Sequence, residues 1–153
     1  MKYITSLDLS ENEKKLIEDA FMAAEHSISS SGHKVGCAIL CENGEIFKGA
    51  TNSRTRAIGS TCAERMAVDQ LYFHHNKKPK MFALAGTFSR EGWSNDFVCT
   101  PCGVCLEMLF EMTLNLNLDD IDFLCLSWNK DKILKIKLSE LYPQFGKSKW
   151  RRI

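Results

Sequence analysis

The stretch Thr61-Cys62-Ala63-Glu64-Arg65-Met66-Ala67 is the most informative part of this chain, together with Thr100-Pro101-Cys102-Gly103-Val104-Cys105 further on. The two stretches supply three cysteine thiols and the carboxylate of Glu64. Three thiolates leave the fourth position of a tetrahedral Zn²⁺ open, which is typical of catalytic rather than structural zinc sites. A carboxylate that does not bind the metal can move protons at that open position. The pattern predicts a catalytic zinc centre, with Cys62, Cys102 and Cys105 as ligands and Glu64 as the proton shuttle.

Both stretches are expected to open helices. Residues 52–61 are polar, contain Gly59 and show no sustained period, so they form a loop that leads to a helix beginning at Cys62. A second helix begins near Cys102, directly after Pro101. Helix N-termini favour negative charge, which lowers the pKa of a thiol placed there. Two helix N-termini are therefore expected to meet at one metal ion.

The rest of the chain has the pattern of a mixed sheet covered by helices. A helix is predicted from about Ser10 to Ser30, since apolar residues recur there every three or four positions, and Ser10 with Glu13 has capping-box spacing. The helix that starts at Cys62 is expected to run toward His75, with a polar stop over residues 76–80. The predicted strands are five, and Asn43-Gly44 marks a hairpin between the first two. They span residues 35–41, 46–51, 81–87, 121–127 and 133–136.

Composition limits the class of protein. A chain of 153 residues fits one domain, residues 1–153, with an ordinary core. The net charge of +1 predicts no strong attraction to a polynucleotide or a membrane surface. No apolar run is long enough for a membrane span, and residues 1–7 lack the features of a signal peptide, so a cytoplasmic location is expected. Seven cysteines are an odd number, which fits metal ligands plus buried thiols, Cys37 and Cys41 among the latter.

Two other interpretations of the cysteines stay open at this point. Cys102-Gly103-Val104-Cys105 at a helix start has the form of a redox dithiol, but that interpretation leaves Cys62 and Glu64 unexplained. A purely structural zinc site is the other possibility, with Cys99 as its fourth ligand.

The motifs resemble those of the cytidine deaminase family, in its small three-cysteine, homotetrameric form, to which blasticidin-S deaminases are related. The resemblance rests on C-A-E-R at 62–65, P-C-G-x-C at 101–105, G-E-I-F-K-G at 44–49 and L-S-E-L-Y-P at 138–143, and covers nearly the whole chain. It implies a three-layer α/β/α fold with a five-stranded mixed sheet, one Zn²⁺ per subunit and a homotetramer. It also implies that Arg65 donates hydrogen bonds toward the ligand thiolates, and that Phe145 or Trp150 lies near a neighbouring pocket.

The function that the resemblance implies is zinc-dependent hydrolysis of a C–N bond. A cytidine-like nucleoside would become its uridine counterpart in pyrimidine salvage, and ammonia would be released. Glu64 would take a proton from the attacking water and pass protons to ring N3 and the leaving nitrogen. The alternative is a modified aminopyrimidine nucleoside, such as a blasticidin-type antibiotic or an N4-substituted cytidine. Outside enzymes, a zinc-stabilised binding module is the remaining possibility. A polynucleotide substrate is disfavoured.

The residues expected around the substrate are Asn52, Arg54, His33 and Ala63, and two of them depart from the family pattern. The family usually has Asn-x-Glu where this chain has Asn52-Ser53-Arg54, and an aromatic residue where it has His33. A carboxylate accepts hydrogen bonds from sugar hydroxyls, whereas a guanidinium only donates and prefers phosphate or carboxylate partners. We therefore expect Arg54 or Arg56 to adapt the site to an altered, acidic substituent or to a ribose that is held differently.

Overall fold

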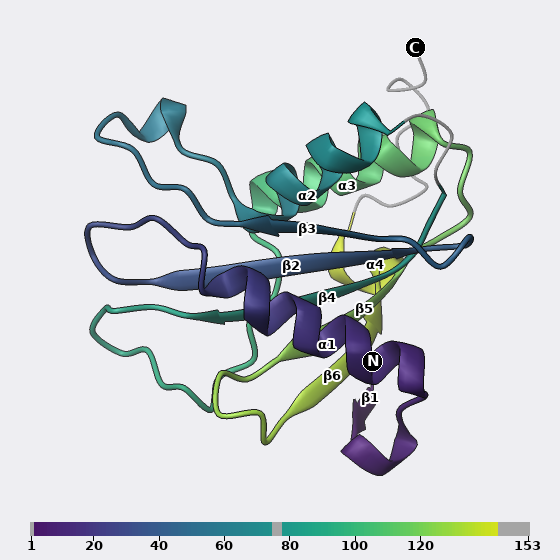
Figure 1. The fold of residues 1–153 in the computed structure, drawn as a ribbon, viewed down its shortest axis with the longest axis horizontal. Coiled ribbons are helices and arrows are strands. Elements are labelled where there is room, and N and C mark those ends of the chain that lie inside the picture. The colour runs from purple at the N-terminus through teal and green to yellow at the C-terminus, as the bar shows by residue number, and fades with distance from the viewer. Residues whose placement is uncertain (1, 75–77, 144–153) are drawn as a thin grey trace.

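The computed structural model describes residues 2–74 and 78–143 and shows a mixed sheet between two helical layers (Figure 1). Helix α1 covers one face of the sheet, and helices α2, α3 and α4 cover the other. The elements are β1 Lys2–Ile4, η1 Ser6–Asp8, α1 Glu11–Ala24, β2 Lys34–Cys41, β3 Ile46–Ala50, η2 Ala57–Gly59, α2 Ala63–Phe73, β4 Pro79–Thr87, α3 Gly103–Asn115, β5 Asp122–Leu126, β6 Ile133–Lys137 and α4 Leu138–Leu141. None of the helices in the described ranges is long and apolar enough to cross a membrane.

The strands are ordered β1-β6-β5-β4-β2-β3. Strands β4 and β5 are parallel and are joined through α3, while the other neighbours are antiparallel. The sheet therefore has six strands, and the expectation of five was wrong by one. The missed strand is β1, which pairs with β6 at the edge. Its three residues are too few to show the alternation from which a strand is predicted.

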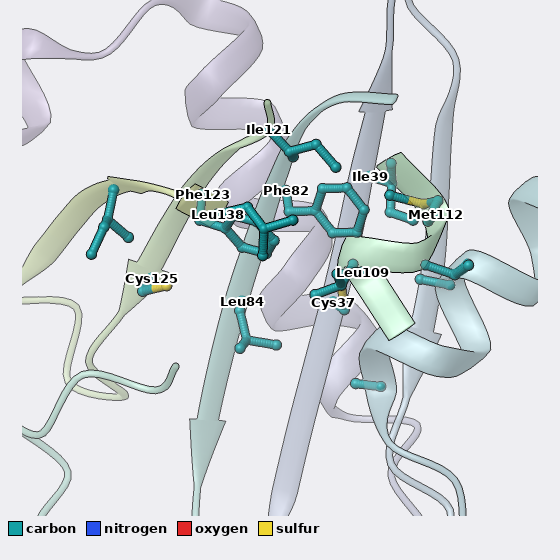
Figure 2. Packing of buried hydrophobic residues seen from close by; sticks show 14 of the residues in the cluster. Cys37, Ile39, Phe82, Leu84, Leu109, Met112, Ile121, Phe123, Cys125 and Leu138 are labelled. Atoms are coloured by element: carbon teal, nitrogen blue, oxygen red, sulfur yellow. The ribbon is translucent and has the colours of Figure 1, made fainter. Parts of the chain in front are cut away.

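Alternating residues of the central strands divide the core into two clusters. On β2, Cys37, Ile39 and Cys41 face the α2–α3 side, and Ala38 and Leu40 face α1. Both cysteines are buried, as predicted for small apolar residues. Figure 2 shows the larger cluster, with Phe82 and Phe123 next to each other, and these two rings stack with their centroids 5.0 Å apart. This cluster supports the helical layer that carries the cysteine motifs.

Two glycines allow the helices to lie close to the sheet. A Cβ on Gly49 of β3 would lie 2.2 Å from the carbonyl oxygen of Ala63 and 2.5 Å from the amide nitrogen of Ala67. A Cβ on Gly36 of β2 would lie 2.0 Å from the carbonyl oxygen of Ala20. Only glycine fits at such distances, so Gly49 determines how closely the first turn of α2 approaches the sheet.

The first helix begins where the sequence predicts but ends earlier. Ser10 Oγ accepts a hydrogen bond from the Glu13 amide at 3.3 Å, and the Glu13 carboxylate accepts one from the Ser10 amide at 2.8 Å. The helix ends at Ala24 rather than Ser30, because the residues that follow bond to strand ends. Ser27 Oγ accepts from the Val35 amide at 3.1 Å, and the Ile28 amide donates to Thr51 at 2.9 Å.

Two other boundaries differ from the sequence prediction. Helix α2 ends at Phe73 with His74 as its C-cap, earlier than predicted, and His75, toward which it was expected to run, lies outside the described residues. Strand β4 begins at Pro79, two residues before the predicted start at Met81. Pro79 opens the strand, a position at which its missing amide hydrogen is tolerated.

Candidate active site

The three cysteines of the predicted zinc centre lie together at two helix N-termini. Cys62 is the N-cap of α2, Cys102 is the N-cap of α3, and Cys105 lies in the first turn of α3. Their three Sγ atoms all lie within 4.8 Å of one another. Zn–S bonds of about 2.3 Å in tetrahedral geometry need sulfur atoms about 3.8 Å apart, so the cluster fits one zinc ion with small side-chain adjustments.

Charge is shared unequally among these sulfurs. The pKa of the Cys62 thiol is lowered to about 6, mainly because it accepts a hydrogen bond from the Cys105 thiol. A weaker hydrogen bond from Cys102 and the positive charge of Arg65 lower this pKa further, whereas burial opposes the shift. The pKa of Cys105 is raised, first because its thiol donates to Cys62 and then because it is buried. One thiolate thus accepts hydrogen bonds from neighbouring thiols, and this arrangement concentrates negative charge where a cation would bind.

The fourth ligand of a purely structural site is absent from this group. Cys99 is buried, and burial raises the pKa of its thiol well above the usual range. Among the described residues, the group of close potential ligands consists of Cys62, Cys102 and Cys105 without Cys99. A three-ligand centre with an open position fits this geometry better than a closed four-cysteine site. The close approach of Cys62 also distinguishes the cluster from an isolated redox dithiol.

Glu64 is placed beside the cluster by the first turn of α2. Glu64 is only 4% exposed and lines a cavity of about 500 Å³, which Cys62 and Cys102 also line. Burial raises the pKa of Glu64 to about 7, although a hydrogen bond from its own backbone amide opposes the shift. A carboxyl group with a pKa near neutrality can both accept and donate a proton.

The cavity walls are apolar and hydroxyl-rich. Glu64 is the only acidic residue among the described residues that line it, and Arg65 also lines it. Phe88 lines the cavity from the end of β4 and stacks on His33, with ring centroids 5.9 Å apart. The hydroxyl side chains in the lining are Thr51, Ser53, Ser60, Thr61 and Thr100. Such walls can hold a flat ring and bind neutral polar groups at its edges.

Of the four residues predicted around the substrate, one lines the cavity. His33 lines the cavity, whereas Asn52, Arg54 and Ala63 are not among its lining residues. Asn52 exchanges two backbone hydrogen bonds of 3.0 Å with Thr61. The Arg54 amide donates to Ser60 Oγ at 2.9 Å, and Ala63 is fully buried above Gly49. The roles of these residues toward a substrate stay predictions.

Several lining residues were missed by the sequence analysis. Phe88 follows the last residue of β4, and Ser53 lies after β3 with its hydroxyl oxygen 3.1 Å from His33 Nε2. Ile58 and Val104 border the cavity with exposed apolar side chains, 95% and 63% accessible. Ser53 could not be identified from the sequence, because its contact with His33 joins residues 20 positions apart.

Together, the fold and the cysteine cluster define a zinc deaminase type of site. The chain belongs to the family described as the cytidine and deoxycytidylate deaminase zinc-binding region, whose sequence model matches residues 10–116. The matched range contains all three cysteines and Glu64. This confirms the resemblance that the sequence motifs indicated.

Solved structures of similar proteins have the same fold. A cytidine deaminase from Burkholderia pseudomallei has a TM-score of 0.69 at 21% identity, covering 88% of this chain and 98% of that one. A cytidine deaminase from Mycobacterium leprae has a TM-score of 0.65 at 18% identity, covering 88% of this chain and all of that one. The cytidine deaminase from Bacillus anthracis has a TM-score of 0.61 at 19% identity, covering 85% of this chain and 86% of that one.

Proposed function

We propose that the protein is a zinc-dependent hydrolytic deaminase that converts a cytidine-like nucleoside to its uridine counterpart and releases ammonia. The observation that carries the proposal is the placement of Glu64, which is buried in the cavity wall beside the three-thiol cluster. Membership of the deaminase family supports the reaction type. A cytidine-like base is supported by the names of the similar structures, each of which is called a cytidine deaminase.

The cysteines and Arg65 have complementary roles in this proposal. Cys62, Cys102 and Cys105 hold the ion, and zinc, when bound, supplies the Lewis acidity that activates water. Three thiolates carry more negative charge than one Zn²⁺ neutralises. The positive charge of Arg65, which already lowers the pKa of Cys62, offsets part of this excess.

Glu64 transfers the protons in the proposed reaction. Its carboxylate accepts a proton from the water that adds to C4 of the pyrimidine ring, and the resulting carboxyl group donates to ring N3. Glu64 then accepts the proton of the new hydroxyl group on C4 and donates it to the amino nitrogen. The C4–N bond breaks, ammonia leaves, and C4 becomes a carbonyl carbon. The burial of Glu64 fits this double role, because it brings the pKa of the carboxyl group close to neutral pH.

The proposed reaction can be tested by incubating zinc-loaded protein with cytidine and 2′-deoxycytidine. The measurements are ammonia release and the loss of ultraviolet absorbance. Glu64→Ala should lower kcat by about 10²- to 10⁴-fold, as expected when a general acid–base is removed, while zinc content stays stoichiometric. The matched control is Asp69→Ala, an exposed acidic residue later on the same helix. Equal activity in Glu64→Ala and the parent protein would contradict the proposal and favour a zinc-stabilised binding module.

A modified aminopyrimidine nucleoside is the second candidate substrate. It is favoured by the cavity lining, in which no carboxylate besides Glu64 is present among the described residues. Arg54 is next to this lining, because its amide bonds to Ser60 and its side chain lies beside Gly59. Ammonia release from a blasticidin-type nucleoside, or amine release from N4-methylcytidine, without turnover of cytidine would support this candidate.

We also propose a single domain over residues 1–153, a homotetramer and a role in cytoplasmic pyrimidine salvage. The exposed apolar side chains of Ile58 and Val104 beside the cavity support an interface that covers its rim. Phe145 and Trp150, predicted near a neighbouring pocket, lie outside the described residues. Light scattering tests the assembly, and a monomeric mass would contradict it.

A further inference from the structure

The turn after β4 brings a cationic side chain next to the cavity. The Arg90 amide donates to the carbonyl oxygen of Phe88 at 3.0 Å, and the Trp93 amide donates to that of Arg90 at 3.2 Å. Gly92 has φ of 78°, a conformation that glycine adopts without strain. In Figure 1, the loop after β4 lies at the same end of the sheet as the loops before β2 and after β3. These three loops supply the cavity residues Phe88, His33 and Ser53.

Two aromatic rings hold the guanidinium group of Arg90. Its Cζ atom lies 5.1 Å from the centroid of the Phe88 ring and 5.5 Å from that of the Trp93 ring. The two rings meet edge to face, with their centroids 4.6 Å apart. Contacts of this kind favour a planar guanidinium over an ammonium group. Because Phe88 also lines the cavity, the positive charge of Arg90 is held beside the cavity wall.

The hydrogen-bond donors of this guanidinium stay available to a ligand. A guanidinium has five N–H donors at its edge, whereas an aromatic ring contacts its face. Within residues 2–74 and 78–143, the Arg90 side chain makes no hydrogen bond or ion pair. The acidic residues near it in the sequence do not neutralise it, since Asp96 pairs with Lys132 at 3.4 Å and Glu91 makes no ion pair with it.

The cavity lining has no spare negative charge for Arg90. The one acidic residue among the described lining residues is Glu64, which is needed at C4 of the base in the proposed reaction. The lining cation Arg65 already acts on the Cys62 thiol. The best partner for the unused donors of Arg90 is an anion, because phosphate and carboxylate oxygens match pairs of guanidinium N–H groups.

We propose that the substrate carries an anionic group, a phosphate or a carboxylate, and that Arg90 binds this group beside the Phe88 wall of the cavity. This inference rests on the proposed function, in which the pyrimidine ring lies at Glu64. The anionic group would then be attached to the end of the nucleoside farthest from the base, the 5′ position. Arg90 is chosen over Arg54, because no ring contact among the described residues holds the Arg54 guanidinium.

Steady-state kinetics on cytidine, cytidine 5′-monophosphate and the 5′-carboxylate of cytidine test the inference. In zinc-loaded parent protein, at least one anionic substrate should have a kcat/KM about 10- to 100-fold higher than that of cytidine, the gain expected for a charge-assisted hydrogen bond. Arg90→Gln should remove this advantage through KM and leave the values for cytidine unchanged. The two anionic substrates distinguish a nucleotide from a carboxylated nucleoside.

Two further variants separate the charge of Arg90 from its geometry and its place. Arg90→Lys keeps the charge but loses the planar donor pairs, so it should retain only part of the preference. Lys130→Gln is the matched control, because Lys130 Nζ lies 4.7 Å from the Phe21 ring centroid and neither residue lines the cavity. It should keep the full preference. Raising the ionic strength should weaken the preference in the parent protein but not change Arg90→Gln.

Three outcomes overturn the inference. The first is a parent protein that turns over cytidine at least as well as both anionic substrates. The second is an Arg90→Gln variant that keeps the preference, and a loss in Arg54→Gln instead would assign the anion to Arg54. The third is an equal fall in kcat/KM for all three substrates in Arg90→Gln, which would show that Arg90 only supports the turn after β4.

Calorimetric binding of the products distinguishes this inference from the proposed function. Uridine, uridine 5′-monophosphate and the 5′-carboxylate of uridine are titrated into the zinc-loaded parent protein and Arg90→Gln. Tighter binding of an anionic ligand that is lost in Arg90→Gln, without deamination of any substrate, would support the anion site and contradict the proposed reaction. Deamination without a preference for an anionic substrate would overturn this inference alone. Absence of both binding and deamination would overturn both.

Discussion

Arg65 of α2 affects the cysteine cluster through its positive charge. It is exposed, lines the cavity, and lowers the pKa of Cys62 through its positive charge. Lowering a thiol pKa favours the thiolate that a metal needs, and outer groups of this kind tune metal affinity in proteins. In the proposed zinc centre, Arg65 would act on the ion through the charge of Cys62.

Arg65→Gln should weaken zinc binding by about 10-fold, because neutral glutamine no longer stabilises the Cys62 thiolate. The affinity is measured by competition with a chromogenic chelator at fixed pH. Arg56→Gln is the matched control, an exposed arginine in the loop before α2 that does not line the cavity. Equal zinc affinities in the two variants would show that Arg65 has no role at the cluster.

At the scale of elements, the site depends on how closely α2 lies on the sheet. Gly49 of β3 faces the backbone between Ala63 and Ala67, the first turn of the helix that carries Cys62 and Glu64. A side chain at this position would push that turn away from the sheet. Displacement of about 1 Å is enough to disturb a catalytic arrangement.

Gly49→Ala should destabilise the protein by about 1–3 kcal/mol, the usual range for overpacking, and should also weaken zinc binding. Its new Cβ would lie 2.2 Å from a backbone oxygen, which no side-chain rotation relieves. Urea unfolding and zinc stoichiometry are the measurements. Gly103→Ala is the control, since a Cβ there meets nothing within 4 Å. Similar losses in both variants would contradict the steric explanation.

Local signals in the sequence predicted elements well where neighbouring residues determine the structure. The capping box of Ser10 and Glu13 marks the start of α1, and Gly44, with φ of 85°, forms the hairpin turn predicted from Asn43-Gly44. Contacts between residues far apart in the sequence could not be predicted from such local signals. The hydrogen bond between His33 and Ser53 joins residues 20 positions apart, and Ile28 fits the helical period but bonds to Thr51 after the helix has ended.

At the scale of the whole molecule, the cysteines that fit a zinc ion come from two segments that are far apart in the sequence. Cys62 lies after the β3–α2 loop, and Cys102 and Cys105 lie after the loop that follows β4. The larger core cluster lies between the sheet and α2, α3 and α4, below these helix starts. This core needs no metal to form, so the protein without zinc should stay folded while its site becomes less stable.

Removal of zinc by a chelator should lower Tm by roughly 10 °C, because an ion that binds only the folded state at about a thousand times its Kd contributes about 4 kcal/mol. Far-UV circular dichroism should retain the helical signal, since the two core clusters persist. The parent protein and Cys62→Ser are compared with and without zinc. Zinc should raise the Tm of the parent and have little effect on Cys62→Ser. An equal rise in both proteins would place the stabilising ion outside the cysteine cluster.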